Sequence, residues 1–333
     1  MSAGKRAILR EEKRQERERR KRIELANKML IPVSKKTTET LGILSFDPSG
    51  TFRLNDKRYL KVYSFDGDYS GLVENIKSLN GRIRVSISTM GDGGRATCHI
   101  TLMESGEIYE AAREKLEKDE AVLRMAGTLT PLSVDETMQK IAANFGKEVG
   151  FNYASYVRGN KDWRKECLNT VQAGSSDFTL KDLYGKGFIN LIYPSEITSG
   201  FLDEFLSLSC PMSVVMDLNP LSEGEQGDFL LGMEKSYNRR LLNRTEDGFF
   251  NLSVSLVFFC DSEDAMRIVG NTIEAIALAK GLTLAPAFNM QAAVVESALT
   301  YGLIDYKVMR NVSEKTIYAL LGGEEDADAK IKI

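Results

Sequence analysis

The segment from Gly187 to Ser222 constrains the fold most, because its apolar pattern describes a complete strand–helix–strand unit. The first part has a period of two and stops at Pro194, the middle part has a helical period, and the last part returns to a period of two before Pro220. The apolar residues that carry these periods are Ile189, Leu191 and Tyr193, then Phe201, Leu202, Phe205, Leu206 and Leu208, then Met212, Val214, Met216 and Leu218. Such a unit indicates a sheet with helices packed against it.

Strands and helices alternate in the rest of the body in the same way. In the first half we predict two strands within 51–65 around the turn Asn55-Asp56, a helix over 68–80, strands over 81–90 and 95–105, and helices over 106–127 and 133–146. In the second half we predict a helix over 223–242, a strand over 249–259, a helix over 262–280, an extended segment over 283–288 and a helix near Gln291. The fold class is therefore α+β, with ferredoxin-like βαβ units and mixed or antiparallel sheets, and no repeat of 20–50 residues is visible.

Two local patterns refine this prediction. Ile83, Val85 and Ile87 alternate with polar residues, which is typical of a half-buried strand. Ser133 and Glu136 have the spacing of a capping box at the start of a helix.

The N-terminal segment differs in charge from the rest of the chain. Residues 1–36, called the basic arm below, hold 13 Lys+Arg and 5 Glu, a net charge of +8, so the remaining chain carries −11 of the total of −3. Residues 5–30 contain no Gly or Pro, and Arg10 to Arg22 includes no apolar residue. We therefore expect a helix that projects from the body instead of burying a face. Pro32 is expected to end it, and residues 322–333 read as an acidic disordered tail.

Composition indicates a globular, cytoplasmic protein. The chain has 333 residues, 43% hydrophobic and 27% charged, with no apolar run long enough to cross a bilayer and no signal-peptide pattern at its start. Its four cysteines lie far apart in the sequence, which favours reduced, buried thiols.

Several segments resemble the N-terminal half of the assembly ATPases of type IV secretion and conjugation machines, the family that includes TrbE and CagE. They are the unit from Tyr193-Pro194 to Asp217-Leu218-Asn219-Pro220, the segment 52–71, the segment 249–302 and the closing Arg310 to Leu321, which resembles a helix leading into the family's motor domain. Together the resemblance covers about residues 37–321. One element departs from the family, since Leu299-Thr300-Tyr301-Gly302 stands where the family has Leu-Pro-Leu-Gly.

The family's ATPase chemistry belongs to a motor domain with a phosphate-binding loop, G-x-x-x-x-G-K-[ST]. No such string occurs in these 333 residues. The resemblance therefore implies the scaffold half without the motor half, a chain that is not itself an enzyme and needs no cofactor. We expect a non-catalytic assembly component of a conjugative transfer or secretion machine. It would lie peripherally on the inner face of the membrane and bind a small inner-membrane subunit and the motor protein, with self-association possible.

Other chemistry has simpler explanations. We interpret Gly91 to Gly94 as a hairpin turn instead of a phosphate nest, and His99, the single histidine, as a strand residue without metal or triad partners. The acids Asp261, Glu263 and Asp264 match a helix N-terminus. No catalytic, cofactor or metal residues are therefore predicted.

The basic arm has three interpretations: docking to a partner protein near the membrane, a solvated spacer, or nucleic-acid binding. Interleaved glutamates and the absence of aromatic residues before Thr40 weigh against nucleic acid. The candidate partner-docking residues are Lys13, Arg14, Arg17, Arg19, Arg20, Lys21 and Arg22.

Two other functions therefore stay open: the scaffold half of a split ATPase whose motor is a separate chain, and a DNA-binding accessory protein. The expected divisions are the basic arm (1–36), two α+β subdomains (37–150 and 151–321) and the tail (322–333).

Overall fold

The structure is a computed structural model that describes residues 43–90, 96–152, 162–192, 201–221, 249–280, 282–305 and 309–321. It also describes the isolated positions 13, 14, 17, 31, 32, 155, 159 and 224–226.

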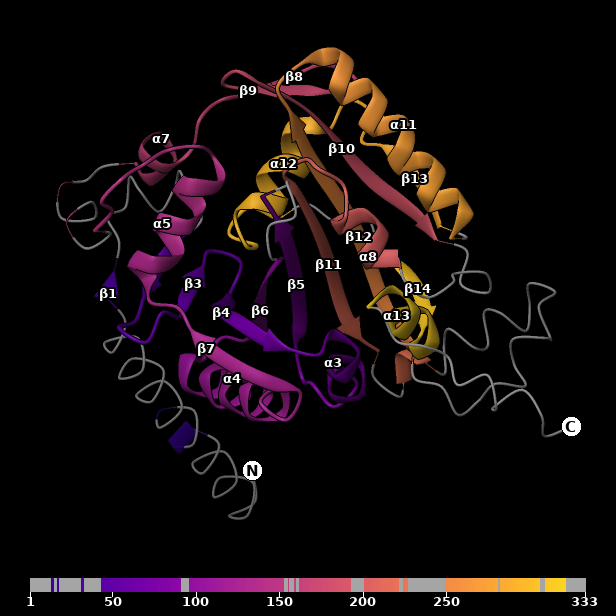
Figure 1. The fold of residues 1–333 in the computed structure, drawn as a ribbon. Helices are drawn as coiled ribbons and strands as arrows, with labels where there is room; N and C mark the ends of the chain where they lie inside the picture. The colour runs from indigo at the N-terminus through magenta and orange to yellow at the C-terminus, as the bar shows by residue number, and fades with distance from the viewer. Residues whose placement is uncertain are drawn as a thin grey trace, which may run out of the picture.

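Within the described residues, one antiparallel sheet of fourteen strands runs through the body (Figure 1). From one edge the order is β1 (Ile31–Pro32), β2 (Ile43–Phe46), β3 (Phe52–Leu54), β4 (Arg58–Gly67), β6 (Thr97–Ser105), β5 (Arg82–Thr89), β11 (Met212–Pro220), β12 (Phe249–Cys260), β10 (Leu183–Ile192), β9 (Phe178–Leu180) and β8 (Val171–Ala173). Three further strands belong to the sheet but lie outside this order: β7 (Gly127–Pro131) pairs with β4, β13 (Leu282–Pro286) with β10, and β14 (Arg310–Ser313) with β12.

Helices cover both faces of the sheet, so the core has two parts. One face packs against α3 (Tyr69–Ile76), α4 (Tyr109–Leu123), α8 (Phe201–Leu206), α11 (Glu263–Ala279) and α13 (Glu314–Leu320). The opposite face packs against α5 (Val134–Asn144), α7 (Trp163–Cys167) and α12 (Gln291–Leu299). Because both faces are covered, polar residues of the central strands are buried as well as apolar ones.

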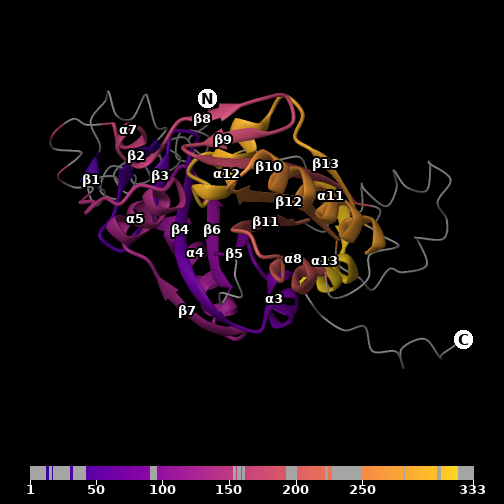
Figure 2. The same cartoon turned by 45° about the horizontal axis from the view of Figure 1, so that its top comes forward.

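The two halves of the body have the same topology. The first half runs β4-α3-β5-β6-α4-β7 with the strand order β7-β4-β6-β5, and the second runs β10-α8-β11-β12-α11-β13 with the order β13-β10-β12-β11. The halves join where β5 pairs antiparallel with β11, with Ser86 opposite Val215 near the middle of the pair. Figures 1 and 2 show β5 and β11 side by side at the centre of the molecule. This junction is called the seam below.

Side-chain contacts repeat along with the topology. In each half a lysine on the first strand lies over an aromatic ring two residues later and pairs with a glutamate on the second long helix: Lys61 with Tyr63 and Glu120, and Lys186 with Phe188 and Glu274. The lysine nitrogen lies 5.3 Å and 4.9 Å from the two ring centroids. The edge strands carry related sequences, Thr-Leu-Thr-Pro at 128–131 and Thr-Leu-Ala-Pro at 283–286. These matches support an internal duplication with a period far longer than 50 residues.

Most predicted elements are confirmed. The strands around Asn55-Asp56, the hairpin of β5 and β6, the strand–helix–strand unit, and the helices that became α3, α4, α5, α11 and α12 all form near their expected positions. Ser133 caps α5, and Glu136 bonds back to the Ser133 backbone, so the capping box is confirmed. Ser262 caps α11 by accepting the backbone N–H of Ala265, and Glu263 and Asp264 lie in the first turn of that helix, as predicted.

Two predictions are wrong in part. β5 is buried on both faces, because α12 and the turn after it cover the polar side that we expected to face solvent. The closing segment is not one helix, since Arg310–Ser313 pairs with β12 as a strand before α13 begins. The turn at Gly91 to Gly94, most of the predicted helix over 223–242 and the tail lie outside the described residues.

Candidate functional site

A strip of buried charge lies on the polar side of the seam. Arg84 of β5 stands directly opposite Asp217 of β11, so the two side chains emerge side by side from neighbouring strands. Both are buried: Arg84 has no solvent exposure and Asp217 is 3% exposed. Charges in such a place are tolerated only when they are paired and their hydrogen-bonding groups are satisfied.

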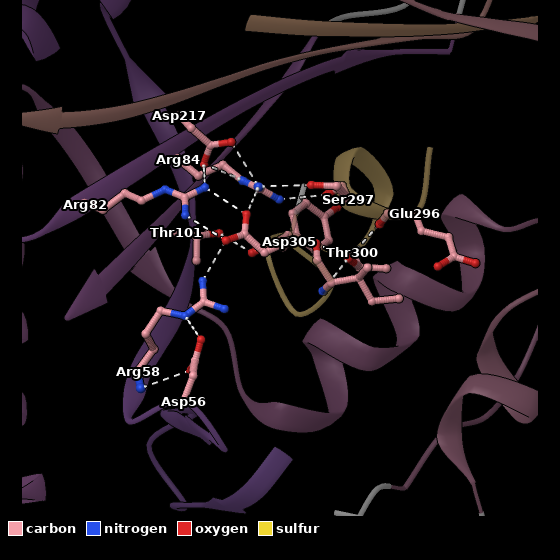
Figure 3. A network of polar contacts seen from close by, with 12 residues as sticks. Asp56, Arg58, Arg82, Arg84, Thr101, Asp217, Glu296, Ser297, Thr300 and Asp305 are labelled. Carbon is pink, nitrogen blue, oxygen red and sulfur yellow. Dashed lines mark hydrogen bonds and ion pairs between the residues drawn. The ribbon is translucent and has the colours of Figure 1, made fainter. Parts of the chain in front are cut away.

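Arg84 meets that requirement through a dense set of hydrogen bonds (Figure 3). Its Nε and Nη2 donate to the two carboxylate oxygens of Asp217 at 2.9 Å and 3.0 Å, a bidentate geometry. Its Nη1 donates to the carbonyl of Ser297 at 2.7 Å, and Nη2 also reaches the Ser297 hydroxyl at 3.2 Å. Because Ser297 lies in the last turn of α12, the cation also faces the negative end of that helix dipole.

Asp305 is the second acid of the network and is contacted by three arginines. It accepts hydrogen bonds from Arg58 at 2.8 Å and from both Nη atoms of Arg82 at 3.0 Å, and Arg84 lies 3.4 Å away. Burial alone would raise the pKa of Asp305, but the hydrogen bond and charge of Arg82, with the charges of Arg84 and Arg58, hold it well below its usual value. The aspartate is therefore ionised throughout the physiological range.

The turn after α12 carries Asp305 to this position. Thr300 donates to the carbonyl of Glu296 at 2.7 Å and accepts from the Ile304 backbone N–H at 3.1 Å, which closes the turn. Gly302 has φ of +93°, and a Cβ there would lie 2.6 Å from the Met103 methyl group. L side chains rarely adopt that φ, so the turn favours glycine at this position.

A cavity of about 320 Å³ opens beside the network. It is lined by Arg58, Asn80, Gly81, Arg82, Met103, Glu104, Ser105, Lys115, Asn219 and Met309. The first half of the chain supplies most of these residues, and Asn219 comes from β11 across the seam.

Glu104 is the unusual group in this cavity. It is 3% exposed, and no described residue donates a hydrogen bond to its Oε1. The Lys115 ammonium lies 3.7 Å from Oε2, which is beyond hydrogen-bonding distance. Burial, followed by the charge of Asp119 and a side-chain hydrogen bond with Asp119, raises the pKa of Glu104 to about 7 against the opposing charge of Lys115. The nearby Asp119 carboxylate accepts the backbone N–H groups of Asn80 and Gly81 at 3.0 Å and 3.1 Å.

A second cavity, of about 300 Å³, occupies the corresponding place at the other end of the seam. The strand pairings of the two halves show which residues correspond. In this match Leu183, Pro211, Phe259 and Met90 of the second cavity correspond, in that order, to Arg58, Arg82, Met103 and Asn219 of the first, which is called the charged cavity below. The cross-strand pair Ser88 and Ser213, with hydroxyls 2.8 Å apart, likewise corresponds to Asp217 and Arg84. The duplicated site is therefore charged in the first half and mostly apolar in the second.

The residues proposed from the sequence lie elsewhere. Lys13, Arg14 and Arg17 are helical and exposed, whereas Arg19, Arg20, Lys21 and Arg22 lie outside the described residues. Their role in partner docking stays a prediction.

The histidine and the cysteines that were predicted to be structural are buried. His99 is 5% exposed, its ring centroid lies 5.0 Å from that of Tyr301, and burial, with the charge of Lys140, lowers its pKa to about 4. All four cysteines are buried free thiols. Among the residues that the structure describes, no three His, Cys, Asp or Glu side chains form a metal-binding group.

Sequence reasoning missed Arg82, Arg84, Asp217, Asp305 and Glu104. The available signal was an arginine at alternate positions of one apolar strand, Arg82 and Arg84, and a lone aspartate in another, Asp217. The partners of Arg84 are 133 to 221 residues away in the chain, so only the fold joins them.

Comparisons with known proteins leave the family open: no family model and no curated protein matches this chain. In the described part of the chain, no helix combines the length and apolar character needed to cross a bilayer.

Proposed function

We propose that this chain is a non-catalytic assembly component of a conjugative transfer or type IV secretion-like machine, built on two fused ferredoxin-like units. The sequence resemblance to the scaffold half of the assembly ATPases motivates the assignment to such a machine. The β-α-β-β-α-β order and strand arrangement of each half motivate the ferredoxin-like assignment.

The observation that carries the proposal is the continuity of the sheet across the seam. β5 and β11 pair over seven residues, from Ile83 opposite Leu218 to Thr89 opposite Met212. Arg84 then ties β5 to β11 through Asp217 and to α12 through Ser297. Two units locked in this way form a rigid platform that can hold partners in fixed relative positions, which is what an assembly component requires.

The charge distribution suggests how the platform is attached. The basic arm carries +8 and the remaining chain −11, so the two parts suit partners of opposite charge. In this proposal the arm docks to machine proteins at the inner face of the membrane, where anionic lipids also favour basic segments.

The proposal is tested by chemical cross-linking of the full-length chain in its native cells, followed by identification of the cross-linked proteins. We expect subunits of one secretion or conjugation machine, and we expect the triple charge reversal Lys13→Glu, Arg14→Glu and Arg17→Glu to reduce those cross-links. A matched control reverses Lys57, Arg113 and Arg267, cations with exposed side chains on the body. Cross-links that are unrelated to such a machine, or that survive the arm variant unchanged, would contradict the proposal.

A further inference from the structure

The second cavity, called the apolar cavity below, runs from the surface into the protein. Its lining includes buried residues such as Met212 and Phe259 and exposed ones such as Ala143 and Lys181. Its volume of about 300 Å³ lies at the lower end of the range of small-molecule sites. This is the volume of about ten water molecules at ~30 Å³ each, so a ligand of about ten non-hydrogen atoms would fill it.

The polar side chains of the lining are already satisfied. The hydroxyls of Ser88 and Ser213 lie 2.8 Å apart and bond to each other, and the Asn144 amide donates to the Leu299 carbonyl at 3.0 Å. The buried side-chain atoms that lack a hydrogen bond within the described residues all belong to residues outside this lining. An apolar ligand can therefore displace water from the cavity without leaving a buried side-chain polar atom unpaired, and such burial is favourable.

The lining carries one charge. Among the described residues that line the cavity, Lys181 is the only one with an ionisable side chain. Its ammonium donates to the Gly146 carbonyl, which uses one of its three N–H groups, and it has no acidic partner within the described residues. The ligand that complements this cavity therefore combines an apolar body with one negative charge.

The backbone holds Lys181 at the rim of the cavity at some cost. Lys181 lies in the two-residue turn between β9 and β10 with φ of +55°, a place where Asn and Gly are the usual residues. Gly146 makes room for its side chain, since a Cβ there would lie 3.3 Å from Lys181 Nζ. Residues other than glycine that are held in the left-handed region cluster at functional sites.

The first half shows that the shared fold does not require an apolar cavity at this place. In the charged cavity, Arg58 and Arg82 both donate to Asp305. The corresponding residues of the apolar cavity are Leu183 and Pro211, which bring neither a charge nor a side-chain donor. The apolar lining is therefore a property of the second half alone, as a site with its own ligand requires.

We propose that the apolar cavity binds a small apolar carboxylate, a hydrocarbon of about eight carbon atoms that ends in one carboxylate group. The hydrocarbon lies against Leu183, Pro211 and Phe259, and the carboxylate accepts a hydrogen bond from the Lys181 ammonium at the rim. This site is independent of the scaffold role, so a failure to bind such a ligand would leave the proposed function untouched.

Binding is tested with the purified full-length chain by isothermal titration calorimetry at neutral pH, using octanoate, hexanoate, octan-1-ol and octylammonium as probes. We expect octanoate to bind with one-to-one stoichiometry. Hexanoate should bind about tenfold more weakly, because it buries two methylene groups fewer. Octan-1-ol should bind more weakly than octanoate, and octylammonium more weakly still, because its charge repels that of Lys181.

A first variant tests the charge. Lys181→Met keeps the length of the side chain and removes the ammonium group, so it should weaken octanoate binding about fivefold and leave octan-1-ol binding unchanged. The matched control is Lys57→Met. Lys57 is also an exposed lysine with a positive φ, of +64°, and it lies in the turn before β4 of the first half. This control should leave the binding of both probes unchanged.

A second variant tests the place of binding. Ala143 is an exposed residue of the cavity lining in α5, so Ala143→Trp should obstruct the cavity and weaken octanoate and octan-1-ol alike. Ala121→Trp, at an exposed position of α4, is the control and should change neither affinity. The proposal is overturned if octanoate shows no saturable binding, if octylammonium binds as tightly as octanoate, or if either Lys181→Met or Ala143→Trp leaves the octanoate affinity unchanged.

Discussion

Replacing Arg84 with methionine should destabilise the protein strongly, because it removes the cation that joins the two halves. Asp217 would lose a bidentate partner, and the Ser297 carbonyl would lose a donor in a buried place. Breaking a buried ion pair from one side costs about 3–5 kcal/mol. Because Asp217 keeps its 2.6 Å hydrogen bond from Arg82, we expect a value near the lower end, about 3 kcal/mol.

The measurement is urea denaturation followed by tryptophan fluorescence and circular dichroism, with the change in unfolding free energy taken from the midpoint. The duplicated fold offers a matched control. Ser88 and Ser213 form the corresponding cross-strand pair with one neutral hydrogen bond, so Ser88→Ala should cost only about 1 kcal/mol.

The double variant Arg84→Met with Asp217→Leu should recover part of the loss, since no unpaired aspartate then remains at the seam. The reasoning about the seam is refuted if Arg84→Met costs no more than Ser88→Ala, or if the double variant is less stable than Arg84→Met alone.

Four further predictions concern single groups. Folding raises the Glu104 pKa to about 7 from 4.5, so the free energy of unfolding should fall as pH rises through that window, and Glu104→Gln should flatten the fall in pH-dependent denaturation. Asp305 behaves oppositely, because its folded pKa is depressed: its contribution is present above the usual value of 3.8 and is lost as pH falls below it, and Asp305→Asn should remove this part of the acid sensitivity. Ser133→Ala should cost about 1 kcal/mol in urea denaturation because α5 loses its capping box, and a cost near zero would contradict the cap assignment. Burial raises the Cys98 pKa to about 12, so this thiol should react with a disulfide reagent only after unfolding, and rapid reaction of the native protein would show that the site is open.

The sequence was a good guide wherever a local pattern determined the structure. The period of two in 212–218 predicted β11, although that strand is buried on both faces, and the helical period in 263–279 predicted α11, whose buried residues form one stripe. The spacing of Ser133 and Glu136 located the start of α5 for the same local reason.

The candidate site could not be predicted in this way. Arg82 and Arg84 alternate with Ile83 and Val85, which is the usual pattern of a strand with one solvated face. Their burial depends on a second helix layer and on acids from distant segments, and a period of two carries no information about either. The repeat of Thr-Leu-x-Pro at 128–131 and 283–286 was a local sign that the two halves match, but it spans only four residues.

We propose that this chain positions other proteins and does not itself turn over nucleotide. The most direct test is equilibrium binding of ATP to the purified full-length chain, with and without magnesium. We expect no saturable binding at micromolar ATP. Saturable, magnesium-dependent binding in that range would contradict it.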